Sequence, residues 1–394
     1  MRVTFLFLLS AVGCGTGVPE GSLTQRDDFL EEADAALGCV RADDGDLVVD
    51  APVVLNRYFA PLASVDAGAT VLPVDGGRGA PVTVAAGDRL LVVQMQGAEL
   101  DPELALVSGT LTAGTWELVV ATGPATDDGI PVEGQGLGGG LVNGYALRPG
   151  HDASGAATWQ VVRIPQLANL TLSDGGEVRP EPWDGQTGGL LAVDVAGTVT
   201  FDGGALDASG MGFRGGRAET LLRNGAGQSG APGHKGEGLA GGSARLFSSA
   251  TGIFTDHVAP GYALPAGEGT RAPANGGGNA RLSNDAAGGG GGHGGDGGIG
   301  GAGARRNRAN AGAGGTAVAA VDLGVQTLLL GGGGGGAAGD DPIPDLAAGS
   351  GQSGGGIVWL RAGAIDVVST GAVRANGAGG VVAPAEGAGG GGAG

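Results

Sequence analysis

The chain has 394 residues, 90 of them glycine, and a formal net charge of −19, with 15% charged and 4% aromatic residues. This acidity argues against nucleic acid as a partner, because such binding depends on Lys and Arg that neutralise phosphates, and against anionic lipid. The hydrophobic fraction of 41% falls in strand-length runs, which argues against wholesale disorder and predicts an all-β protein with glycine-rich insertions.

Residues 1–14 are predicted to be a lipoprotein signal peptide. Arg2 provides the basic start, residues 3–12 form a short apolar run, and Gly13 precedes Cys14. Residues 9–14 resemble a bacterial lipobox, so Cys14 is the predicted lipidation site of an exported, outer-membrane or surface protein. Lipidation would leave Cys39 as the single thiol, whereas ordinary secretion would permit a Cys14–Cys39 disulfide. The lipid is then the only predicted contact with the membrane.

Residues 15–46 are predicted to be a tether with a short helix. Ser22 and Gln25 fit a capping box, apolar residues follow at helical spacing, and Gly38 is a natural end, so we expect a helix over about 23–37.

Residues 47–166 are predicted to form a barrel or sandwich of short strands. The runs 90–95, 116–120 and 159–164 have the length and β-branched content of strands, and turn-forming residues separate them.

Residues 167–394 are predicted to form a parallel β-helix-like domain, because they contain an internal repeat. Residues 189–197 correspond to 355–363, and 204–210 correspond to 371–377. Each copy reads as strand, glycine turn and strand, so we expect the copies to stack, with residues 211–352 leaving the stack as a glycine-rich excursion.

The excursion contains glycine at a period of three in residues 291–302 (GGHGGDGGIGGA), and a run of glycine at 331–336. Three residues per turn is the period of a polyproline II helix, and glycine faces let such helices approach closely. We therefore expect a packed polyproline II insertion in which Gly294, Gly295, Gly297 and Gly298 face neighbouring backbone. The alternative is a disordered loop, because glycine-rich sequence has high chain entropy.

No catalytic constellation emerges, and we expect a protein that is not an enzyme. The four histidines have no metal-ligand spacing. Calcium is the one cofactor with candidate ligands, in two acidic turns that otherwise read as solvated loops. These candidate residues are Asp43, Asp44, Asp46, Asp340, Asp341 and Asp345. Asp194, Asp202 and Asp207 are the carboxylates that a polysaccharide-active enzyme would need on adjacent strands. Lys235 is read either as a special residue near Glu237 or as an accident of composition.

Seven short motifs resemble a family of large glycine-rich bacterial surface proteins that carry the label adventurous gliding motility. They are 92–98 (VVQMQGA), 161–166 (VVRIPQ), 183–189 (WDGQTGG), 210–216 (GMGFRGG), 235–238 (KGEG), 331–336 (GGGGGG) and 354–363 (GGGIVWLRAG). The resemblance runs from about residue 50 to the end and implies no catalytic residue. Members of that family tend to continue past the final glycine run, so the chain is expected either to be a fragment or to end in a last polyproline II segment.

Together these patterns predict a cell-surface-anchored structural or adhesion protein, and the family resemblance implies a connection with gliding motility. Its expected partner is an extracellular polysaccharide or another surface protein. The alternative is an extracellular polysaccharide-binding or polysaccharide-active β-helix protein, since parallel β-helices often host such enzymes.

Overall fold

The computed structural model describes most of the chain, and its secondary structure is almost entirely β. The described residues are 7–8, 42–100, 107–149, 155–220, 233–243, 245–248, 253–256, 261–262, 272, 274–280, 286–302, 311–318, 327–339, 349–380 and 388–394. Within them the single helical element is a short 3-10 turn, η1 (Leu137–Gly139). The all-β prediction is confirmed, while the helix expected at 23–37 lies outside the described residues. In the part of the chain that is described, no helix is long and apolar enough to cross a bilayer.

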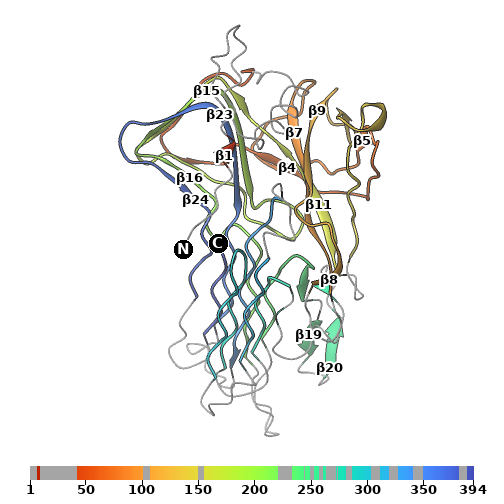
Figure 1. Cartoon of the computed structure of the whole chain (residues 1–394), viewed down its shortest axis with the longest axis vertical. Coiled ribbons are helices and arrows are strands. Elements are labelled where there is room, and N and C mark those ends of the chain that lie inside the picture. The colour runs from red at the N-terminus through yellow and green to blue at the C-terminus, as the bar shows by residue number, and fades with distance from the viewer. Residues whose placement is uncertain are drawn as a thin grey trace, which may run out of the picture.

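Residues 57–163 form a curled antiparallel sheet that makes half a barrel (Figure 1). Its eight strands are β4 (Arg57–Phe59), β5 (Val71–Leu72), β6 (Arg78–Gly79), β7 (Arg89–Leu100), β8 (Val107–Leu111), β9 (Trp116–Ala121), β10 (Ile130–Glu133) and β11 (Ala157–Arg163). Strands β7, β9 and β11 confirm the three predicted strands. The sheet continues from β5 through β10, β9, β7, β11 and β4 to β6, and β8 pairs with β7.

Both faces of the central strands β7 and β11 are buried, which explains why four apolar residues, 90–93, follow one another in β7. Side chains alternate across a strand. Leu90 and Val92 pack with Trp159 in a core on one face, while Leu91 and Val93 pack on the other face in the core that reaches the rest of the molecule.

A stack of parallel strands lies beside the half-barrel. One sheet contains β2 (Leu47–Val49), β12 (Gln166–Leu167), β13 (Leu170–Ser173), β15 (Leu190–Asp202) and β23 (Ile357–Val367), with β1 (Phe7–Leu8) on the edge of β23. The other sheet contains β3 (Pro52–Val53), β14 (Glu177–Val178), β16 (Ala205–Asp207) and β24 (Ala372–Arg374). We call the pairs β2–β3, β13–β14, β15–β16 and β23–β24 the four tiers.

The expected parallel β-helix is not what the structure shows. Only the second and third tiers follow one another directly in the chain. The chain leaves the stack after the first tier to build the half-barrel, and leaves again after the third tier to build the glycine-rich part. The first tier also comes from residues 47–53, which the sequence assigned to the barrel. The four tiers are therefore not successive turns of one coil.

The two repeat copies do stack against each other, as expected. Ala205 pairs with Ala372, as the repeat aligns them. In the longer strands Leu190 pairs with Ile357, whereas the repeat aligns Leu190 with the residue before Ile357. A register shift between Val195 and Thr198 then restores the pairing that the repeat predicts. A bulge of this kind adds a residue to one strand without a signal in the repeat.

The glycine-rich excursion, together with residues 352–355 and 390–393 that follow it in the chain, forms a bundle of extended segments below the sheets (Figure 1). Residues 331–336 form its centre, and their backbone hydrogen bonds repeat every three residues, the period of a polyproline II helix. Gly331 and Gly334 donate to Gly355 and Gln352, and the next residue in each triplet donates to a different neighbour.

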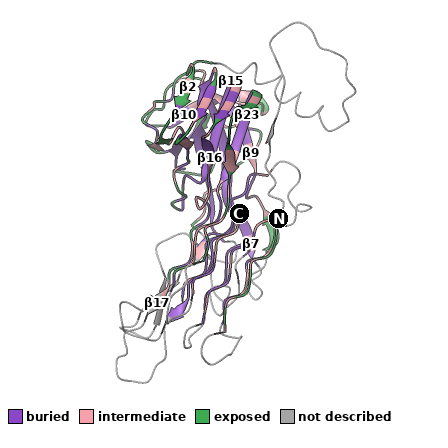
Figure 2. Cartoon of the chain, turned by 90° about the vertical axis from the view of Figure 1, so that its left-hand side faces the viewer, coloured by how far each residue is buried: buried purple, intermediate pink, exposed green. Residues whose placement is uncertain are grey.

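Six segments surround the central one and hydrogen-bond to each other in a closed ring. In ring order they are 213–217, 234–237, 277–280, 289–292, 390–393 and 352–355. Every residue from Leu328 to Ala338 is buried, and buried residues continue from the strands into the bundle (Figure 2). A Cβ on any of the six central glycines would overlap a backbone carbonyl oxygen, which belongs to Asn275 in the case of Gly332 and to a ring segment in the other five. The run at 331–336 is therefore all glycine because the central segment has neighbours on every side.

The tract 291–302 does not continue as one helix. It bends at residues 293–295, and the two arms pair antiparallel, with Gly290 donating to Gly298 and Ala287 donating to Gly301. Gly297 faces the backbone of Gly290 as expected. The expectation was wrong for Gly294, Gly295 and Gly298, where an added Cβ would meet nothing within 4 Å.

Six short strands pair in twos around the bundle. They are β17 (Glu219–Thr220) with β22 (Ala338–Gly339), β18 (Gly242–Ser243) with β21 (Gly261–Tyr262), and β19 (Arg245–Ser248) with β20 (Ile253–Asp256).

Candidate functional site: the junction of the three parts

Polar side chains gather where the half-barrel, the tiers and the glycine bundle meet, and we call this region the junction. The loop 183–189 (WDGQTGG) lies at its centre and carries one of the seven motifs. Gly185 and Gly188 have φ of +106° and +93°, so only glycine takes this backbone without strain. The loop connects the second tier to the third, and Trp183 packs edge-on against Phe213 of the bundle.

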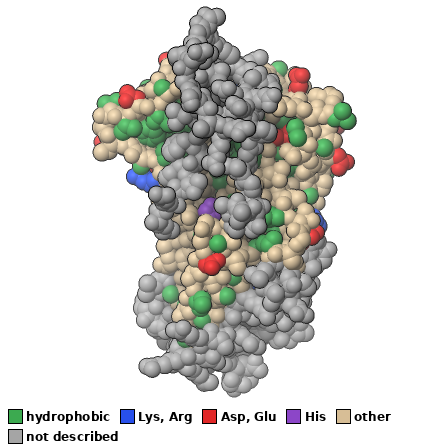
Figure 3. Space-filling view, viewed as in Figure 1, with side chains coloured by type: hydrophobic (Ala, Val, Ile, Leu, Met, Phe, Trp, Pro, Cys, Tyr) green, Lys and Arg blue, Asp and Glu red, His purple; other side chains and the backbone are tan. Residues whose placement is uncertain are grey.

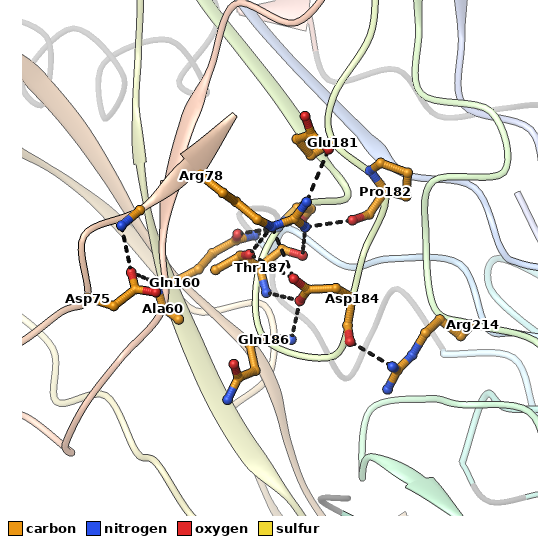
Figure 4. A network of polar contacts seen from close by, with 12 residues as sticks. Ala60, Asp75, Arg78, Gln160, Glu181, Pro182, Asp184, Gln186, Thr187 and Arg214 are labelled. Carbon is orange, nitrogen blue, oxygen red and sulfur yellow. Dashed lines mark hydrogen bonds and ion pairs between the residues drawn. The ribbon is translucent and has the colours of Figure 1, made fainter. Parts of the chain in front are cut away.

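Arg78 of the half-barrel holds this loop with one guanidinium group (Figure 4). Its Nε lies 2.7 Å from Thr187 Oγ1 and 3.0 Å from Asp184 Oδ2, and its Nη1 lies 3.1 Å from Glu181 Oε2. Its Nη2 donates to the carbonyls of Pro182 and Thr187 at 2.8 and 2.9 Å. A planar five-donor fork suits this set of acceptors better than a lysine would.

Arg214 holds the same loop from the side of the bundle. Its Nη1 donates to the carbonyl of Asp184 at 2.6 Å, and its Nε lies 2.8 Å from Glu237 Oε2. Burial by itself lowers the pKa of Arg214, but the charge of Glu237 and its hydrogen bonds raise that pKa above its ordinary value. The buried Glu237 also accepts a hydrogen bond from Gln96 of β7 at 3.0 Å. This carboxylate therefore joins the half-barrel to the bundle.

Glutamine side chains complete the contacts. Gln160 of β11 binds both the N–H and the carbonyl of Gly188, at 2.8 and 2.9 Å. Gln94 of β7 donates to three carbonyls and accepts the N–H of Ala146. Buried amides are stable in such places because each of their polar atoms has a partner.

A buried charge cluster ties three strands together behind the loop. Asp194 of β15 is 0% exposed and lies 2.7 Å from Arg89 Nη1 of β7 and 2.9 Å from Arg361 Nε of β23. Both arginines are also buried. The carboxylate is thus enclosed by guanidinium groups rather than open to a substrate.

The other two candidate carboxylates do not join Asp194. Asp207 accepts the N–H of Ser209 at 2.8 Å and lies 3.5 Å from Arg374. Burial by itself raises the pKa of Asp207, but the bonds from Ser209 and the charge of Arg374 hold it below its ordinary value. Asp202 is exposed at the end of β15, beside Ser173. No carboxylate pair in acid–base geometry therefore results from these three residues.

The first acidic turn is engaged in structural contacts. Asp44 accepts hydrogen bonds from Arg163 Nη2 at 2.9 Å and from the N–H of Gln166 at 2.7 Å, and Asp46 accepts from Asn169 at 2.9 Å. The described residues contain no group of three or more His, Cys, Asp or Glu that could hold a metal ion. Asp340, Asp341 and Asp345 lie outside the described residues, as do Cys14 and Cys39.

Lys235 is buried, with 3% of its surface exposed, in the ring segment that also carries Glu237. On the face seen in Figure 3, the charged side chains of the described surface are scattered and form no single patch.

Comparison of the chain with family models, with curated proteins and with solved structures finds no match in any of the three. The family resemblance of the motifs stays a prediction.

Four of the motifs, 92–98, 183–189, 210–216 and 235–238, thus meet at the junction, where their residues bond to each other. Sequence reasoning singled out the motifs that contain Gln96 and Arg214 but not the roles of these residues, and it missed Arg78 and Gln160, which lie outside the motifs. The one available signal was a polar side chain directly before a glycine, as at Arg78, Gln96 and Arg214. Such a pattern suits a side chain that reaches into close-packed backbone.

Proposed function

We propose that this chain is a cell-surface-anchored structural or adhesion protein that holds a rigid glycine bundle on a β support. The observation that carries the proposal is the closed ring around residues 331–336, in which backbone packs against backbone. The central segment consists of glycine alone, so it presents backbone and no side chain to its neighbours. The polar residues of the motifs hold the bundle against the sheets. A protein that carries force or displays a surface requires such a fixed connection.

The anchor in this proposal is a lipid on Cys14, which inserts in the outer membrane. Residues 15–46 are the tether between this lipid and the folded part of the chain. Metabolic labelling with a fatty-acid analogue is expected to mark the wild type and not Cys14→Ser. Protease added to intact cells is expected to degrade the wild type if the bundle faces outward. Equal labelling of both proteins would remove the anchor, and full protection from protease would remove the surface location.

The adhesion role needs a separate test. Cells that display the wild type are compared with cells that display Gly335→Ala, which is expected to disrupt the bundle, and Gly298→Ala as the matched control. Binding to extracellular polysaccharide or to neighbouring cells is expected to fall only for Gly335→Ala. Equal binding by all three would leave a structural protein without adhesion.

A second candidate is polysaccharide binding by the tiers themselves. The observation that favours it is the stack of parallel strands, which is similar to a short piece of β-helix. In that case a glycan array should give binding that survives Gly335→Ala, provided that the β support remains folded. Turnover of the bound glycan would support the enzymatic form of this candidate.

A further inference from the structure

The four tiers align their apolar side chains in columns. The strand registers place residues of the same kind above one another from tier to tier. The three columns are Leu47–Leu170–Val199–Ile365, Val49–Leu172–Phe201–Val367 and Val53–Val178–Leu206–Val373. Stacked parallel strands are stabilised when each tier covers the apolar column of the next.

Both ends of this stack expose apolar side chains of their end tiers. Phe201 and Leu206 in the third tier are 4% and 0% exposed, whereas Val367 in the fourth tier is 59% exposed and the adjoining Val368 63%. At the opposite end Val53 is 36% exposed and Val48, on the outward face of β2, is 64% exposed, whereas Val49 is 4% exposed.

The backbone edges are open as well. Among the described strands, nothing pairs with the outer edges of β2, β3 and β24, or with β23 beyond Arg361. Open edges with apolar side chains are templates for pairing with another chain.

The fourth tier accepts a parallel strand where one is present. Phe7 and Leu8 of β1, which lie within the predicted signal peptide, run parallel to β23 and pair with Leu360 and Arg361. Among the described strands, this pairing leaves the rest of that edge of β23 and the outer edge of β24 unpaired, and removal of residues 1–14 would take β1 away as well. A strand that continues the stack at this edge must therefore run parallel and carry apolar residues in the column positions.

The first tier of a second copy meets both requirements. We propose that copies of this chain stack end to end, with β23–β24 of one copy paired in parallel with β2–β3 of the next. Such stacking would place Leu47 of the second copy on Ile365, its Val49 on Val367 and its Val53 on Val373. On the outward face of the strands, the same stacking would place Val48 of the second copy beside Asp366 of the first. Val48 is uncharged, so no like charges meet there.

This contact joins two different surfaces, so it is heterologous and does not close on itself. It produces rows of copies in which each glycine bundle is held at a repeated spacing. The inference concerns the folded β support alone and stands or falls independently of the lipid anchor and of adhesion.

The experiment uses the purified chain with Cys14→Ser, which removes lipid-driven association, and sedimentation velocity over a wide range of concentration. Oligomers are expected to grow with concentration. Val367→Lys and Val53→Lys each place a charge in one end column, and each is expected to weaken self-association at least tenfold. Leu137→Lys is the matched control, because Leu137 is 90% exposed in η1, outside both end tiers.

An equimolar mixture of the two end variants gives the sharpest result. Each variant retains one intact edge, so the mixture is expected to form dimers and nothing larger. If either substitution destabilises the fold, Val368→Lys or Val48→Lys replaces it. A wild type that stays monomeric, or a mixture that does not dimerise, would overturn the proposal. If Val53→Lys leaves self-association unchanged, the β2–β3 edge takes no part in it. This result would overturn the end-to-end proposal and would indicate pairing between the β23 edges of two copies.

Discussion

Glycines of this chain differ in what surrounds them, although the sequence presents them alike. A Cβ on Gly335 in the centre of the bundle would overlap the carbonyl oxygen of Gly278, whereas a Cβ on Gly294 or Gly298 meets nothing within 4 Å. We expect Gly335→Ala to destabilise the protein by about 1–3 kcal/mol or more, because close-packed backbone has no room for a methyl group.

The matched variants Gly294→Ala and Gly298→Ala are expected to be neutral, or to stabilise by about 0.4–1 kcal/mol through the lower entropy of the unfolded chain. Chemical denaturation of the three variants gives the comparison. Equal stability of all three would mean that the central segment is not packed as the structure has it.

His293 is expected to make stability depend on pH. Burial lowers its pKa below the ordinary 6.5, and its Nδ1 is buried without a hydrogen-bond partner among the described residues. Between the folded pKa and 6.5 the unfolded chain binds more protons, so stability falls as pH decreases through this window. His293→Gln is expected to flatten the dependence of the urea midpoint on pH between about 5 and 7.5. Parallel curves for wild type and variant would contradict this assignment.

At the scale of elements, the strands could be read from the sequence and their order could not. The runs at 90–95 and 159–164 lack a regular polar alternation because both faces of β7 and β11 are buried, and their length and β-branched content identify them as strands. The first tier, residues 47–53, was assigned to the barrel because short strands carry no mark of their partner. The bulge between Val195 and Thr198 could not be predicted either, because the repeat carries no sign of the added residue.

The glycine bundle shows this limit most clearly. The period of three in residues 291–302 predicted polyproline II packing but not the bend at 293–295. Which segment lies beside which could not be predicted, since glycine faces are identical and carry no side chain to select a neighbour. The six glycines at 331–336 could have identified the centre, because only a central segment needs glycine at every position.

Asp194 links three strands that are far apart in the chain, β7, β15 and β23. Asp194→Asn leaves the shape unchanged but removes the charge between two buried guanidinium groups. Breaking a buried ion pair in this way costs about 3–5 kcal/mol. We expect a large fall in the urea midpoint, with Asp202→Asn as the control, because Asp202 is exposed at the end of β15. A stable Asp194→Asn protein would imply that the carboxylate has a role other than holding these strands.

At the scale of the molecule, one apolar core runs through all three parts. It contains Leu91 and Val93 of the half-barrel, Phe213 and Leu330 of the bundle, and Trp359 of the fourth tier. A shared core couples the parts, so the bundle and the sheets are expected to unfold in one cooperative transition.

Leu330→Ala tests this coupling, because Leu330 is fully buried where the bundle enters the core. We expect a loss of about 2–5 kcal/mol from the missing side-chain contacts and the cavity left behind. Far-ultraviolet circular dichroism follows the sheets, while near-ultraviolet circular dichroism follows buried aromatics such as Trp183 and Trp359. If the parts are coupled, both signals shift by the same amount and remain coincident. If instead the two signals give separate transitions, and Leu330→Ala leaves the transition of the sheets unchanged, the bundle is an independent unit. A bundle that unfolds alone could not transmit force to the β support or be held rigidly against it.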